Sequence, residues 1–114
     1  MTKAIWSFLP IGMINKYEIW YANVRFEDSY EIKERPVLII NDLAYFVTAY
    51  KMTGTYREGD KEVPVKYWQE AGLSKPTYIR ISKPLRLEKT DLTRKIGVLD
   101  ERDRLRLELR ISRY

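Results

Sequence analysis

The sequence predicts a mainly β fold with small α elements, folded as one compact barrel or half-open sandwich. The chain has 114 residues, which is enough for one domain with a buried core and too few for two independent cores. Several short apolar or aromatic runs follow one another, separated by turn-forming residues, as is typical of small all-β folds. We expect large aromatic side chains to pack the core, among them Trp20, Tyr45, Phe46 and Trp68.

The first two strands are predicted on either side of an acidic segment. Residues 17–26 alternate aromatic or β-branched residues with smaller ones, which indicates a strand with one buried face. The polar residues 27–34 interrupt this pattern, and we expect them to form a loop. Residues 36–40 are continuously apolar and begin with a proline, so they predict a central strand that is buried on both faces.

The middle of the chain predicts a hairpin, a short helix and a further strand. An Asn-Asp pair supplies a turn signal before a third strand at residues 44–52. Residues 66–72 predict a two-turn helix that its last residue, a glycine, ends. Residues 77–81 alternate in polarity and predict another strand, which the following proline would bend or continue at a sheet edge.

The C-terminal segment carries two conflicting patterns. Asp100 and Asp103 resemble the capped start of a helix. From Leu105 to Ile111, however, apolar and charged residues alternate with the period of a strand. As a helix, this segment would expose apolar side chains on two opposite faces, so the residues by themselves leave helix and strand open.

The composition limits the chemistry that this chain can perform. Cysteine and histidine are both absent, which excludes disulfides, thiolate catalysis and zinc sites with thiolate ligands. The usual general base near neutral pH is missing as well. Any catalysis must come from Arg, Lys, Tyr, Ser, Thr or carboxylates. No group of residues has the spacing of metal ligands, so we expect neither a metal nor a cofactor.

Charge and the N-terminal residues indicate partners and location. The chain has 21 Lys and Arg against 16 Asp and Glu, a formal charge of +5 that would attract a polyanion such as nucleic acid, although an ordinary mixed surface has a similar balance. The apolar stretch at residues 5–14 is short and broken by Pro and Gly, so it predicts neither a membrane helix nor a signal peptide. We expect a cytoplasmic protein with a single domain at residues 13–114 and an N-terminal extension at residues 1–12.

Ordered motifs along the chain resemble one known family. Residues 17–22 (YEIWYA), residues 35–40 (RPVLII) and the Met-Thr pair at 52–53 are similar to the three motifs of PemK/MazF-type toxins. Residues 68–80 are similar to a subgroup of PemK-like proteins, and residues 96–109 are similar to the closing isoleucine-glycine-then-helix signature of the family. The resemblance covers about residues 16–110.

The resemblance implies a function as well as a fold. It implies a compact SH3-like barrel of the PemK/MazF/CcdB type with a C-terminal helix, and a homodimer. It also implies the toxin of a toxin–antitoxin system, an mRNA interferase that inhibits growth by cleaving single-stranded RNA without a metal. In that reaction the ribose 2′-OH attacks the adjacent phosphate. A cognate antitoxin would block the RNA groove.

The family's residues can be carried over one position at a time. Arg35 matches the family's Arg and would clamp the scissile phosphate, since a guanidinium binds two phosphate oxygens at once. Thr53 matches the Thr or Ser that ends the third strand, and Arg80 matches a later basic position, so these three are the predicted catalytic residues. The predicted RNA-binding residues are Glu31, Lys33, Arg57, Thr77, Tyr78 and Ser82.

At two positions the sequence departs from the family pattern. Tyr30 and Ser82 stand where many members carry a Glu and an Asp, so the general base is not identified. Two alternatives therefore stay open. One is a toxin of the same fold that binds a protein target such as gyrase through its last residues, 111–114. The other is an RNA-binding module without catalysis.

Overall fold

The computed structural model of this protein describes residues 14–25, 30–56 and 61–113. A short 3-10 turn, η2 (Lys89–Asp91), links the last two strands. The remaining elements are β1 (Glu18–Arg25), β2 (Ile32–Asp42), β3 (Phe46–Thr53), β4 (Glu62–Val65), β5 (Thr77–Glu88), β6 (Leu92–Val98) and the helix α2 (Glu101–Arg113). The expected extension at residues 1–12 lies outside the described residues.

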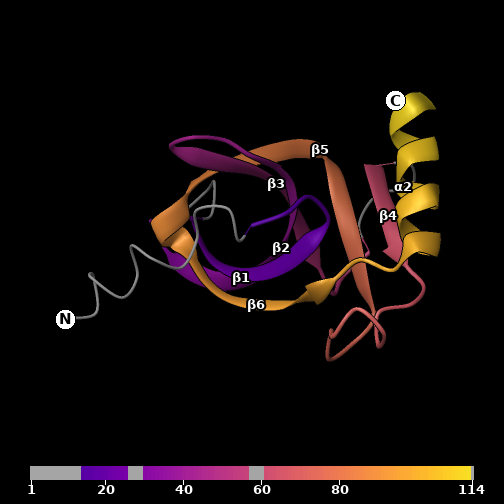
Figure 1. Cartoon of the computed structure of the whole chain (residues 1–114). Helices are drawn as coiled ribbons and strands as arrows, with labels where there is room; N and C mark the ends of the chain where they lie inside the picture. Colours follow the sequence, from indigo (N-terminus) through magenta and orange to yellow (C-terminus); the bar gives the residue numbers. More distant parts are fainter. Residues whose placement is uncertain (1–13, 26–29, 57–60, 114) are drawn as a thin grey trace.

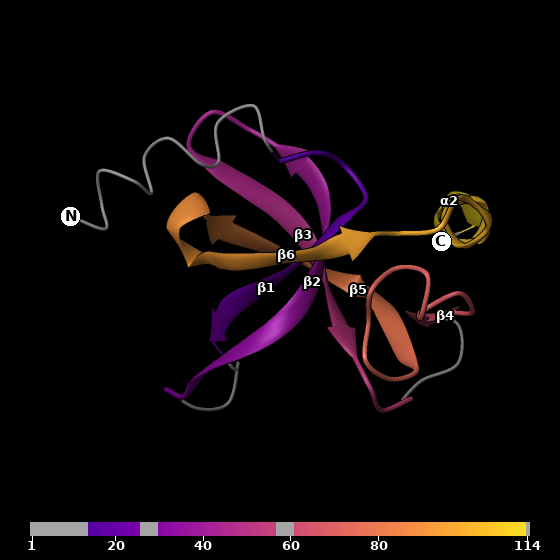
Figure 2. The same cartoon turned by 60° about the horizontal axis from the view of Figure 1, so that its bottom comes forward.

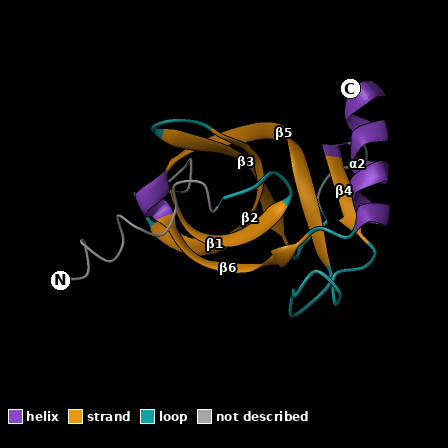
Figure 3. Ribbon diagram, viewed as in Figure 1, coloured by secondary structure: helices purple, strands orange, loops and turns teal. Residues whose placement is uncertain are grey.

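The six strands form one antiparallel sheet in the order β4-β5-β3-β2-β1-β6. The sheet curls strongly into a barrel-like shape, while its two edge strands, β4 and β6, are not hydrogen-bonded to each other in the described part of the chain (Figures 1 and 2). Strands dominate the molecule, and α2 lies alongside β4 at one end (Figure 3). The predicted mainly β fold with a C-terminal helix is therefore confirmed.

Both faces of the central strands are buried. Leu38 and Met52 belong to one apolar cluster, which also contains Leu107 of the C-terminal helix α2. Val37 and Ala49, their near neighbours in sequence, belong to a second cluster on the other face. Successive side chains of a strand point to opposite faces, so an unbroken apolar run is what a strand between two cores requires. The prediction of a doubly buried central strand is confirmed.

The segment between β4 and β5 packs against the end of β6. A Cβ built on Gly97 would lie 2.1 Å from the carbonyl oxygen of Ala71, so the two backbones touch at this point. Gly72 has a φ of 91°, a left-handed conformation that glycine adopts without strain, and its own Cβ position is 2.7 Å from the Ile96 oxygen. Trp68 and Ile96 both pack against the apolar cluster that contains Leu38 and Met52. The segment after β4 thereby contacts β6, so it links the two edge strands, which are not paired with each other.

The helix predicted at residues 66–72 does not form. This segment is a series of turns in which the Ala71 N–H donates to the Tyr67 oxygen and the Leu73 N–H donates to the Trp68 oxygen. Its first N–H groups, of Lys66 and Tyr67, donate to the carboxylate of Asp103 at 2.9 and 2.8 Å. A distant side chain thus fixes the start of the segment, and no local pattern could indicate it.

The C-terminal segment is a helix, as the resemblance implies. Asp100 caps it, because its carboxylate accepts the Arg102 backbone N–H at 2.9 Å. Leu107 is buried, while Leu105 and Leu109 are exposed. As expected for a helix with this sequence, α2 carries apolar side chains on its solvent-exposed surface as well as on its buried side. Asp103, expected to be a surface capping residue, is instead 1% exposed and bound to the 66–72 segment. Among the described residues, no helix combines the length and apolar character needed to cross a membrane.

Several boundaries differ from the predictions. β2 begins at Ile32, so the loop expected over residues 27–34 is shorter, and its residues 27–29 lie outside the described part. The turn of the β2–β3 hairpin falls at residues 43–45, where the Leu43 N–H donates to the Phe46 oxygen. β6 was not predicted, since most of its side chains are exposed and give no apolar pattern. Tyr45, expected in the core, is 88% exposed.

Replacing Gly97 by alanine is expected to destabilise the fold. The new Cβ would lie 2.1 Å from the Ala71 oxygen, a backbone atom that cannot move without displacing the segment. We expect the free energy of unfolding to fall by about 3 kcal/mol, measured by urea denaturation.

Gly54→Ala is the matched control. Its Cβ would meet the end of the Lys75 side chain at 2.9 Å, which can swing away, so we expect a loss below about 1 kcal/mol. Equal losses in the two variants would contradict the backbone contact.

The cap of α2 predicts a pH dependence of stability. The side-chain hydrogen bonds from Arg102, followed by its backbone N–H, lower the pKa of Asp100 from 3.8 to about 2. A lowered pKa means that this interaction stabilises the fold above about pH 4 and that the stabilisation is lost as the pH falls toward 2. The difference in thermal midpoint between the natural chain and Asp100→Asn should therefore shrink over that range. A constant difference between pH 5 and pH 2 would refute the assignment.

Candidate functional site

The strand register places three of the predicted site residues on one face of the sheet. Thr53 of β3 is the Cα partner of Tyr78 of β5, and these two residues form a first row. Val37 of β2 is the partner of Lys51, which is the last pair between β2 and β3 at this end. Arg35 precedes Val37 by two residues, and Thr53 follows Lys51 by two, so alternation gives all of them the same face. Arg35, Thr53 and Tyr78 therefore share this face on three neighbouring strands.

A second row lies beside the first on the same face. Lys51 is the partner of Arg80, and Arg80 is the partner of Glu62 on β4. The Nε atom of Arg80 lies 3.2 Å from Oε2 of Glu62, and the two side chains are 26% and 0% exposed. The face thus carries three cations, of Arg35, Lys51 and Arg80, and one buried carboxylate.

The end of β3 forms a small turn around the hydroxyl of Thr53. This hydroxyl accepts the Thr55 N–H at 3.1 Å, and the side chain is half-buried. A Cβ built on the intervening Gly54 would lie 3.1 Å from Nζ of Lys75, so a further ammonium group lies against this turn. The hydroxyl is held in place by local backbone, next to a cation that the sequence did not indicate.

Aromatic rings flank the same row. Tyr78 is half-buried, and its ring centroid is 5.4 Å from that of Tyr56, which is exposed. Lys33 and Glu31 precede Arg35 at spacings of two residues, both are exposed, and their charged atoms are 3.7 Å apart. Alternation along β2 puts Lys33 on the Arg35 face, and Glu31 lies just before the strand. The rim of the site therefore combines cations with rings that can stack.

The other predicted RNA-binding residues have different environments. Thr77 is 4% exposed, and its hydroxyl donates to the Lys75 oxygen at 2.8 Å, so it belongs to the core side of β5. Ser82 is half-buried, two residues beyond Arg80. Arg57 lies outside the described residues. Thr77 therefore does not belong to the face that carries Tyr78 and Arg80.

Sequence reasoning missed Lys51, Glu62 and Tyr56. None of them stands in a recognisable motif, and each joins the site only through its neighbour across the sheet or in the following turn. Only Lys51 could have been found from the sequence, because it precedes Thr53 by two residues and therefore shares its face on a strand.

The arrangement suits a phosphodiester better than a metal. Guanidinium and ammonium groups bind phosphate oxygens, and aromatic rings stack on bases. Within the ranges 14–25, 30–56 and 61–113, no three acidic side chains gather as metal ligands. Tyr30, at the position where a family Glu is expected, is 93% exposed, and the carboxylate of Glu62 has no exposed surface with which to reach a hydroxyl of a substrate.

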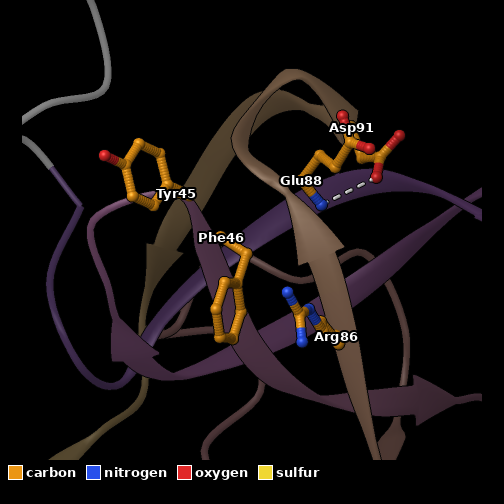
Figure 4. A pocket seen from close by; sticks show the side chains of 5 residues that line it. All are labelled: Tyr45, Phe46, Arg86, Glu88 and Asp91. Carbon is orange, nitrogen blue, oxygen red and sulfur yellow. Dashed lines mark hydrogen bonds between the residues drawn. The ribbon is translucent and has the colours of Figure 1, made fainter.

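A separate hollow lies at the opposite ends of β3 and β5. It has a volume of about 520 Å³ and is lined by Tyr45, Phe46, Arg86, Glu88 and Asp91. Arg86 lies over the ring of Phe46 at 3.8 Å, and the Glu88 N–H donates to Asp91 (Figure 4). Two carboxylates in this hollow would repel a phosphate, so the cationic face at the other end of the strands is the better candidate.

The two candidate arginines should differ in their effect on stability. Arg80→Met removes the partner of a buried carboxylate, and we expect the free energy of unfolding to fall by about 2 kcal/mol, less than for a fully buried pair because Arg80 is 26% exposed. Arg35→Met alters an exposed side chain and should change it by less than about 0.5 kcal/mol. Chemical denaturation measures both, and the reverse order would contradict the geometry.

Comparisons with known proteins identify the family. The family model described as "PemK-like, MazF-like toxin of type II toxin-antitoxin system" matches residues 15–114. The structure of the Mycobacterium tuberculosis toxin MazF-mt6 is similar to this chain, with 29% identity and a TM-score of 0.68 over 84% of this chain and 93% of that one. A second structure, described as an Mtb toxin, is 30% identical with a TM-score of 0.61 over 69% of this chain and 90% of that one.

A more distant likeness supports the fold. An endoribonuclease from Mycobacterial species, solved in complex with its cognate antitoxin, has a TM-score of 0.68 at 15% identity, covering 88% of this chain and 92% of that one. A search of curated protein sequences found no significant match. Because the family model spans nearly the whole chain and the fold agrees, this chain belongs to the PemK-like, MazF-like toxins of type II toxin–antitoxin systems.

Proposed function

We propose that this protein is an mRNA interferase, a toxin that cleaves single-stranded RNA without a metal. The observation that carries the proposal is the single face of the sheet that holds Arg35, the Thr53–Tyr78 pair and the Lys51–Arg80 pair. This face offers two guanidinium cations and an ammonium for phosphate oxygens, a hydroxyl, and an aromatic ring for a base.

The proposed reaction is attack of a ribose 2′-OH on the adjacent phosphorus, with departure of the 5′-oxygen. Negative charge accumulates on the phosphorane oxygens, where fixed cations stabilise it most. Arg35 and Arg80 would bind these oxygens, and Thr53 would orient the phosphate. The proposal assigns no general base, since the carboxylate of Glu62 is buried and Tyr30 replaces the family's Glu.

The substrate class follows from the surroundings of this phosphate site. Tyr78 and Tyr56 form a pair of rings next to it, and base stacking on aromatic rings requires unpaired bases. Lys33 and Lys51 add charge along the path of the backbone. We therefore propose single-stranded RNA as the substrate, with Ser82 and Glu31 at the margins of the groove.

The partners proposed for this chain follow from its family. A structural neighbour was solved with its cognate antitoxin, and we propose that an antitoxin likewise blocks the RNA groove of this protein. We propose a homodimer as the active form and the cytoplasm, where mRNA is found, as the place of action.

Arg35→Ala should abolish cleavage without unfolding the protein. The exposed guanidinium contributes little to packing, and its loss removes stabilisation of the phosphorane, for which we expect a drop in rate of about 100-fold or more. The assay incubates purified protein with a long single-stranded RNA in EDTA and maps the ends of the products.

Arg86→Ala is the matched control, because it removes an arginine at the far end of the same sheet. It should leave cleavage and growth inhibition unchanged. Intact RNA at a molar excess of the natural protein would overturn the proposed activity. Full toxicity of Arg35→Ala would instead refute the site assignment.

A further inference from the structure

Three carboxylates are buried in the described part of the chain, and two of them have clear structural duties. The carboxylate of Glu18 accepts hydrogen bonds from the Asn15 backbone and side chain and from the Trp20 indole, and lies 3.0 Å from Nζ of Lys95. Asp103 holds the start of the 66–72 segment. Glu62 differs from both, because it lies in the proposed RNA site with its carboxylate beside Arg80.

The position of Glu62 offsets a repulsion between two cations. Lys51 and Arg80 are direct cross-strand partners, and like charges in this relation repel each other. Glu62 is the cross-strand partner of Arg80 on the other side. With the carboxylate in place, the row carries one net positive charge instead of two. The arginine can therefore be held next to Lys51 on the face where a phosphate would bind.

The carboxylate lies on the Nε side of the guanidinium. Glu62 Oε2 is 3.2 Å from Nε of Arg80, an ion-pair distance without hydrogen-bond geometry, and the Nη groups can still bind two phosphate oxygens. Since the carboxylate is fully buried, swinging Arg80 away would leave a buried charge without this partner, which is costly. The strand that carries Glu62 is itself held from the helix, where Nη1 of Arg110 donates to the Glu62 backbone oxygen at 3.4 Å.

We propose that Glu62 is a positioning residue for RNA cleavage, which orients Arg80 toward the scissile phosphate and takes no proton from the substrate. This inference rests on the proposed function. It predicts that every functional effect of Glu62 passes through Arg80. It also predicts that removing the carboxylate lowers kcat more than it raises KM, because the guanidinium is needed most in the transition state.

A double-mutant cycle tests the proposal. Glu62→Gln, Arg80→Ala and the double variant are assayed on a short RNA that contains a cleavage sequence mapped with the natural protein. We expect Glu62→Gln to lower kcat by about 10- to 100-fold. The kcat of the double variant should be no lower than that of Arg80→Ala. The pH–rate profile of Glu62→Gln should rise and fall at the same pH values as that of the natural protein.

The matched control is Asp103→Asn, which neutralises another buried, arginine-paired carboxylate outside the site. Its thermal midpoint should fall, and its effect on kcat per folded molecule should be small and multiply with that of Arg80→Ala. Glu62→Asp, which keeps the charge, should recover part of the lost kcat and serves as the second variant if Glu62→Gln does not fold. Three results would overturn the proposal. The first is a kcat of the Glu62/Arg80 double variant that is lowered by the product of the two single effects. The others are a pH–rate profile of Glu62→Gln with a shifted apparent pKa, and full activity of Glu62→Gln.

Affinity for a single-stranded RNA whose 2′-hydroxyls are all methylated provides a readout that needs neither cleavage nor a mapped cleavage site. Glu62→Gln should weaken binding in the natural background and have no effect once Arg80 is alanine. If the natural protein binds this RNA but cuts no RNA, the proposed function fails, while this affinity cycle still decides whether Glu62 positions Arg80. Equal weakening in both backgrounds would refute the positioning role even where cleavage is observed.

Discussion

The hydrogen-bond register between β3 and β5 is the constraint on which the site depends. It sets Thr53 against Tyr78 and Lys51 against Arg80, and alternation along β2 gives Arg35 the same face. Side chains alternate between faces, so a slip of one residue would turn Arg80 toward the core and Ile79 toward solvent. The apolar cluster that contains Ile79 and Met52 prevents such a slip, because burying it requires this register. Core packing thereby holds the charged groups in place.

Buried charge links the helix to this sheet. Asp103 accepts the N–H groups of Lys66 and Tyr67, and Arg110 donates to the backbone oxygen of Glu62, so α2 contacts both ends of β4 and its following turn. The Tyr17 hydroxyl, just before β1, also donates to Glu108 of α2 at 2.5 Å. Burial, followed by the bond to Glu108, raises the pKa of Tyr17 to about 12, so this donor also keeps its proton in mildly alkaline solution.

The elements that the sequence predicted well are those set by local patterns. The alternation of residues 17–26 and the apolar run at 36–40 indicated β1 and β2, and the ordered motifs indicated the family. Features set by distant partners were not predictable. The 66–72 segment forms turns instead of a helix, and its first N–H groups bind Asp103, more than thirty residues away. Glu62 joins the site only once β4 is aligned with β5.

One apolar cluster joins residues from the two ends of the described chain. It contains Tyr17 and Ile19 of the first strand region together with Leu99 and Leu107 of the last. Contacts between residues so far apart in sequence form late in folding, because a long stretch of chain must first be closed into a loop. During synthesis, which runs from the N-terminus, the strands that carry Arg35 and Thr53 leave the ribosome well before Leu107. The core beneath the face that carries Lys51 and Arg80 is therefore completed only after most of the polypeptide has been made, which delays the appearance of a folded toxin until then.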